Sequence, residues 1–90
     1  MASTVRNYTL TGPTGTADAD IAVVFNYCER TNTVSVAYLD THECFRRPNS
    51  FGGDRCFARY QGRSVEFGRR QYRKLLNRGY TLTKETVSTY

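Results

Sequence analysis

The sequence predicts a small α+β domain, in which an antiparallel sheet of about five or six short strands, with two hairpins, carries one principal amphipathic helix on one face. In two neighbouring segments, large apolar residues recur at every second position and alternate with smaller or polar ones, as in the strands of a hairpin. A later segment, residues 68–78, has an apolar stripe at helical spacing. With 90 residues, the chain has room for one domain, which we assign to residues 1–90.

Three strands are predicted in the N-terminal half of the chain. Val5 and residues 8–10 form a short first strand, and the Gly-, Pro- and Thr-rich residues 11–19 form a surface loop. Residues 21–28 and 34–39 then alternate in the same way on either side of a short polar stretch, which predicts an antiparallel hairpin at the centre of the sheet.

A helical turn and a second loop are predicted in the middle of the chain. Asp40 and Glu43 have the spacing of a capping box, so a short helical turn is expected over residues 40–46, before Pro48. Residues 48–55 have the composition of a surface loop. This loop carries Phe51 in its middle and three arginines at its ends: Arg46, Arg47 and Arg55.

A second hairpin, the principal helix and a last strand are predicted in the C-terminal part of the chain. Residues 56–60 and 64–67 flank Gln61-Gly62-Arg63, which we interpret as a hairpin turn. The helix is expected over residues 68–78, because Gly79 is a natural helix stop. A strand follows, with Tyr80-Thr81-Leu82-Thr83 at its start.

The helix is expected to be apolar on one side and basic on the other. At 100° per residue, an apolar stripe faces the sheet, flanked by glycines that permit close approach of the backbones; it consists of Gly68, Tyr72, Leu75, Leu76 and Gly79. Five cations lie on the outer side and its flanks: Arg69, Arg70, Arg73, Lys74 and Arg78.

The net charge of +5 is unevenly distributed along the chain. Residues 1–45 hold two cations and five acids, whereas residues 46–90 hold eleven cations and three acids. Most of the cations are arginines, which suit bidentate contact with phosphate and stacking on rings. Clustered arginines attract polyanions, so the helix face and the adjoining loop are the strongest functional signal in the sequence.

No set of catalytic or metal-binding residues stands out. The loop at Gly12-Pro13-Thr14-Gly15 is similar to the start of a phosphate-binding P-loop, but Asp18 occupies the region where the required lysine belongs. The spacing of the single histidine and the three cysteines matches no common zinc motif; these residues are Cys28, His42, Cys44 and Cys56. We therefore expect no enzymatic activity, no cofactor and no metal.

The leading hypothesis is a non-catalytic binding or regulatory module that engages an anionic macromolecule, with nucleic acid slightly favoured over an acidic protein surface. Phe51 and Tyr60 are candidates for stacking on nucleobases. The cations expected to contact phosphate are Arg46, Arg47, Arg55, Arg69, Arg70, Arg73, Lys74 and Arg78.

The alternative is an assembly or inhibitor protein, such as a phage-type accessory protein or virion component, that binds an acidic or apolar partner surface. Edge strands of a small sheet also favour self-association. An odd number of cysteines and the absence of a signal-like or membrane-spanning apolar run favour a cytoplasmic location and no membrane partner. No residue motif identifies a family.

Overall fold

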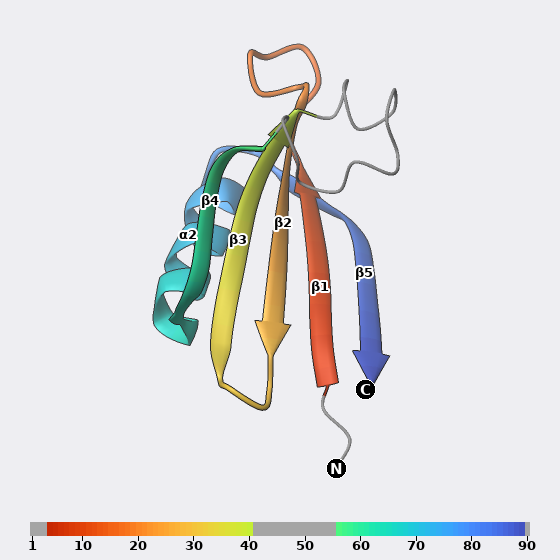
Figure 1. The fold of residues 1–90 in the computed structure, drawn as a ribbon. Coiled ribbons are helices and arrows are strands. Elements are labelled where there is room, and N and C mark those ends of the chain that lie inside the picture. Colours follow the sequence, from red (N-terminus) through yellow and green to blue (C-terminus); the bar gives the residue numbers. More distant parts are fainter. Residues whose placement is uncertain (1–3, 41–55, 90) are drawn as a thin grey trace.

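A computed structural model describes residues 4–40 and 56–89 and confirms the α+β class. In chain order the elements are β1 (Thr4–Thr11), β2 (Ile21–Cys28), β3 (Thr33–Asp40), β4 (Cys56–Ser64), α2 (Val65–Asn77) and β5 (Thr81–Thr89) (Figure 1). Asp40, predicted to begin a helical turn, ends β3 instead. The rest of that turn and the loop at 48–55, with Arg46, Arg47, Phe51 and Arg55, lie outside the described residues.

The strands form one antiparallel sheet in the order β4-β3-β2-β1-β5. The predicted central hairpin is confirmed, because β2 pairs with β3 from Ile21 opposite Asp40 to Cys28 opposite Thr33. The last strand, β5, does not pair with β4 but crosses to the far edge of the sheet and pairs with β1. The helix therefore connects the two edge strands.

The core lies between the sheet and α2. Cross-strand partners point to the same face of a sheet, and two such pairs, Leu10 with Val23 and Phe25 with Val36, supply four buried side chains. The core cluster of buried residues is Leu10, Val23, Phe25, Val34, Val36, Leu75 and Tyr80. The large apolar side chains of these strands thus face the helix, whereas Ala22 and Leu39, which pair with each other, are buried on the opposite side of the sheet.

The predicted second hairpin is wrong, because β4 runs without a break through Gln61-Gly62-Arg63 to Ser64. Val34 pairs with Arg63 and Val36 pairs with Tyr60, so β4 holds one more residue than β3 over this stretch. Gly62, whose φ is +61°, provides the left-handed backbone of this β-bulge. A glycine with positive φ serves a tight turn and a bulge equally well, and the sequence pattern does not separate the two.

The helix begins three residues earlier than predicted, at Val65 instead of Gly68. The Ser64 side chain caps it by accepting a hydrogen bond from the backbone N–H of Phe67 at 3.2 Å, so the strand predicted for residues 64–67 is wrong. The predicted stop at Gly79 is confirmed by its φ of +93°, a left-handed conformation typical of helix ends. The backbone N–H of Tyr80 donates to the carbonyl of Leu75, which completes a Schellman motif at the helix end.

Gly68 allows the helix to lie close to the sheet. A Cβ atom at this position would lie 2.8 Å from Cγ1 of Val34 on β3. Together with Leu75, Gly68 is buried, whereas Leu76, predicted to face the sheet, is 45% exposed. The buried stripe of the helix is consequently narrower than the sequence indicates.

We expect Gly68→Ala to lower the free energy of unfolding by about 1–3 kcal/mol, because the added methyl group would overpack the contact with Val34. This loss opposes helix propensity, which favours Ala over Gly by about 1 kcal/mol. Urea unfolding followed by circular dichroism measures the difference. The exposed Asn77→Ala is the matched control and should be neutral or slightly stabilising; a Gly68→Ala protein as stable as this control would contradict the close contact.

Candidate functional site

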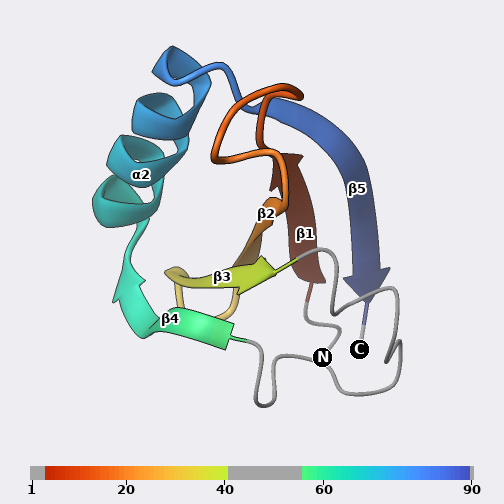
Figure 2. The same ribbon diagram turned by 90° about the horizontal axis from the view of Figure 1, so that it is seen from above.

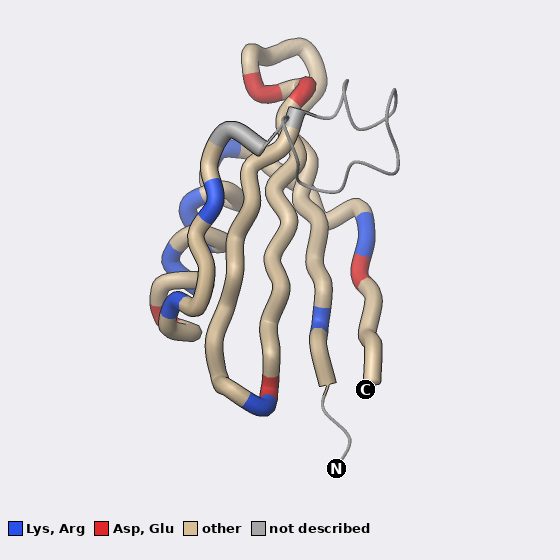
Figure 3. Tube along the Cα trace, in the orientation of Figure 1, with Lys and Arg blue, Asp and Glu red and all other residues tan. Residues whose placement is uncertain are grey.

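Four cations of α2 form an exposed row: Arg69, Arg70, Arg73 and Lys74. These four residues are exposed, whereas Gly68 and Leu75 of the same helix are buried. Figure 3 shows the Lys and Arg positions along α2 in blue. None of the four makes an ion pair with a carboxylate of residues 4–40 or 56–89, including Glu66 in the first turn of the same helix. Their charge is therefore not neutralised by the part of the chain that the structure describes.

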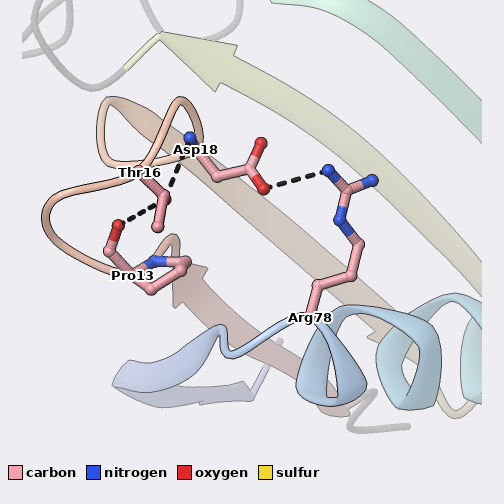
Figure 4. A network of polar contacts seen from close by, with 4 residues as sticks. All are labelled: Pro13, Thr16, Asp18 and Arg78. Atoms are coloured by element: carbon pink, nitrogen blue, oxygen red, sulfur yellow. Dashed lines mark hydrogen bonds and ion pairs between the residues drawn. The ribbon is translucent and has the colours of Figure 1, made fainter.

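Arg78, at the end of the helix, has a different environment. Its guanidinium donates to Oδ2 of Asp18 at 3.0 Å (Figure 4). The β1–β2 loop holds Asp18 in place, because the Thr16 hydroxyl donates to the Pro13 carbonyl at 2.7 Å and accepts from the Asp18 backbone N–H at 3.2 Å. The sequence separation of sixty residues concealed this pair, which makes Arg78 a tether between the loop and the helix end.

Tyr60, predicted to stack on a nucleobase, belongs to β4, lies beside Phe67 of α2 and is 37% exposed. Its ring centroid is 5.3 Å from that of Phe67 and 6.4 Å from that of Tyr38. The guanidinium of Arg63 lies 4.2 Å from the Phe67 ring centroid and 5.8 Å from that of Tyr60. This flank is thus an intramolecular aromatic and cationic cluster.

A groove of about 750 Å³ lies on the other flank of the helix, over β1 and β2. Four aromatic residues line it: Tyr8, Phe25, Tyr27 and Tyr72. Tyr72 joins the helix to the sheet here, because its ring centroid lies 5.4 Å from that of Phe25 and 6.5 Å from that of Tyr8. Both contacts have the edge-on geometry that aromatic pairs prefer. Arg69 belongs both to the groove lining and to the cation row.

Sequence patterns do not reveal this groove. Its rings come from β1, β2 and α2, and only the sheet register and the docking of the helix bring these three elements together. No local pattern in the sequence signals such a meeting of distant residues.

Beyond the groove, three apolar side chains on the same side of the molecule are exposed to solvent. Leu76, Leu82 and Val87 are 45%, 42% and 54% exposed. Leu82 pairs with the core residue Leu10, and Val87 pairs with Arg6, so both lie on the face of the sheet that carries the helix. Arg6 on this face is itself paired, with its Nε 3.3 Å from Oε1 of Glu29, and this carboxylate raises the pKa of Arg6.

The described residues contain no group of three or more His, Cys, Asp or Glu side chains placed to hold a metal ion. They also include no helix long and apolar enough to cross a membrane.

Comparison of the chain with protein-family models, curated proteins and solved structures finds no match. The arrangement places an aromatic groove beside a row of cations.

Two tyrosines of the domain have altered acidity. Burial raises the pKa of Tyr80, and the Asp18 carboxylate raises it further. Burial likewise raises the pKa of Tyr38, with a smaller contribution from Tyr60. The Tyr38 hydroxyl donates to Oε1 of Gln71 on α2 at 2.9 Å. Both shifts arise because the interior disfavours the phenolate.

The domain should therefore lose stability at alkaline pH. A folded-state pKa above the unfolded value means that the stabilisation is complete below the ordinary tyrosine value of about 10 and declines as the pH rises through it. Urea unfolding at a series of pH values from about 8 to 11 should show this decline, with Tyr80→Phe reducing its slope. A free energy of unfolding that stays constant across this range would contradict the burial of these two hydroxyls.

Proposed function

We propose that the protein is a non-catalytic binding module that engages nucleic acid through the cation row of α2. The observation that carries the proposal is the exposure of Arg69, Arg70, Arg73 and Lys74 without a described carboxylate partner. Cations held on one rigid face raise a local positive potential and release counterions when they meet a row of phosphates.

Nucleic acid fits this row better than an acidic protein surface does. Three of its four members are arginines, whose planar guanidinium groups bind phosphate through paired hydrogen bonds. The row has a single carboxylate, Glu66, on the same helix to orient a mixed-charge partner. We further propose a cytoplasmic location, which agrees with an odd number of cysteines in the chain.

Salt-dependent binding tests the proposal. Fluorescence anisotropy with labelled single- and double-stranded DNA and RNA should show tight binding at low salt and a slope of log affinity against log salt of about −3, as four phosphate contacts predict. Arg70→Glu and Arg73→Glu should each weaken binding and reduce the magnitude of this slope by about 1 or more, because each reversal removes at least one contact.

Lys84→Glu is the matched control, because it reverses an exposed cation on β5, outside the helix. It should change the affinity much less than Arg70→Glu. An equal loss in the two variants would show that binding depends on net charge alone, and absence of binding to every nucleic acid at low salt would refute the proposal.

A second candidate function, in assembly, is favoured by Leu76, Leu82 and Val87, which together expose apolar surface on one side of the molecule. In this case the partner surface is a second copy of the chain, as in an assembly protein of the phage-accessory type. Such self-association would also cover the outer edge of β5, which pairs with no other strand of the described residues.

Light scattering distinguishes this candidate from the first. An assembly surface predicts a dimer at high protein concentration that Val87→Ser converts to a monomer, because the substitution removes apolar area from the interface. Thr86→Ser, at the neighbouring exposed position of β5, is the control and should leave the dimer intact. A protein that stays monomeric throughout the concentration range would exclude self-assembly.

A further inference from the structure

The helix covers only part of the face on which it lies. It packs mainly on β3 and β4, whereas β1 and β5 extend beyond it. Figure 2, which views the sheet from above, places α2 at one side and β5 at the other. The aromatic groove occupies the space next to the helix, where Tyr8 and Tyr27 are half-buried.

The rings of the groove are held in place by contacts within the domain. Phe25 is buried beneath them, and Tyr72 lies edge-on to it. The Tyr27 hydroxyl donates to Oδ1 of Asn32 at 3.0 Å. Rings fixed in this way lose little conformational freedom when a flat ligand packs against them.

Polar groups stand around the rings. The groove lining includes Asn32, Ser64, Glu66 and Arg69. Because the Asn32 carbonyl oxygen already accepts from Tyr27, its side-chain N–H groups are available as donors, while the Glu66 carboxylate is an acceptor. This combination of rings with donors and acceptors at the rim is what the flat face and the polar edge of a nucleobase require.

An aliphatic side chain is a poorer occupant. Seated on the rings, it would cover Asn32, Glu66 and Arg69 without giving them a hydrogen-bond partner, and burial of unpaired polar groups is costly. A nucleobase satisfies both kinds of surface, since it has a π-face and hydrogen-bonding edges.

The position of Arg69 links the groove to the cation row. It lines the groove, and Arg70, Arg73 and Lys74 continue the row along the helix. A strand whose phosphates follow these cations therefore has its nucleobases beside the aromatic rings. In a duplex the nucleobases are paired and stacked, and they do not reach these rings.

We propose that the groove binds unpaired nucleobases, so that the nucleic acid engaged by this protein is single-stranded. This inference rests on the proposed function and adds the form of the ligand and the place where its bases lie. The strand is bound without strong sequence preference, because stacking on aromatic rings is available to every base.

The test compares two labelled strands of equal length, oligothymidine of about 12 nucleotides and the same sugar-phosphate chain without bases. Stacking of two bases predicts that oligothymidine binds at least about tenfold more tightly. In the NMR spectrum, ring protons of Tyr8, Tyr27 and Tyr72 should shift on addition of oligothymidine and much less with the abasic strand.

Variants locate the effect. Tyr27→Leu should remove most of the preference for oligothymidine while leaving the affinity for the abasic strand unchanged, and Tyr27→Phe should retain the preference. Tyr60→Leu removes a ring from the other flank of the helix and serves as the matched control. Tyr8→Leu is a second groove variant. The comparison of the two strands on the unmodified protein does not depend on any variant.

The outcomes separate the two proposals. Equal affinity for the two strands, or a preference that survives both groove variants, overturns the role of the groove and leaves the cation row as the binding site. A duplex that binds as tightly as oligothymidine also overturns it. Failure of both strands to bind at low salt refutes the proposed function together with this inference.

Discussion

The structure depends on the need for one helix to carry the chain from one edge of the sheet to the other. β4 and β5 lie at opposite edges, so α2 and its short connection must cross the face between them. Five strands about 4.8 Å apart place the two edges about 19 Å from each other, whereas a helix with its side chains is about 10 Å wide. A single helix therefore covers only about half of the face, and the aromatic groove lies beside the helix on the rest of it.

Contacts at the two ends of α2 determine which part of the sheet the helix covers. Near its start, Gly68 brings the helix against Val34 on β3, which draws it toward the β4 edge. At its end, the Schellman motif turns the chain so that Tyr80 enters the core before β5 begins. The pair between Asp18 and Arg78 adds a contact from the β1–β2 loop to the same helix end. The opening beside the helix is thus fixed by packing at both ends.

Much of the fold could be predicted from the sequence because local patterns encode it. The β2–β3 hairpin follows from alternation, and the helix stop follows from the glycine at position 79. The start of the helix was missed, since residues 64–67 alternate like a strand and the capping role of Ser64 becomes visible only with its bond to Phe67. The cation row was predicted from helical spacing alone. The groove was not, because Tyr8, Tyr27 and Tyr72 meet only through strand register and helix docking.

The irregular pairing between β1 and β5 determines which charged side chains lie on the helix-facing side of β5. Lys84 pairs with Thr9 and Leu82 pairs with Leu10, so Thr83 is an extra residue that reverses the alternation of side chains along β5. In a regular strand, Lys84 would share the helix-facing side with Leu82, and Val87 would point the other way. The inserted threonine thus places Lys84 on the face of the sheet opposite the helix and Glu85, which pairs with Tyr8, on the helix-facing side. Arg6 on this face is paired with Glu29, whereas Arg69 of the helix brings to the groove lining a cation that makes no ion pair with a described carboxylate.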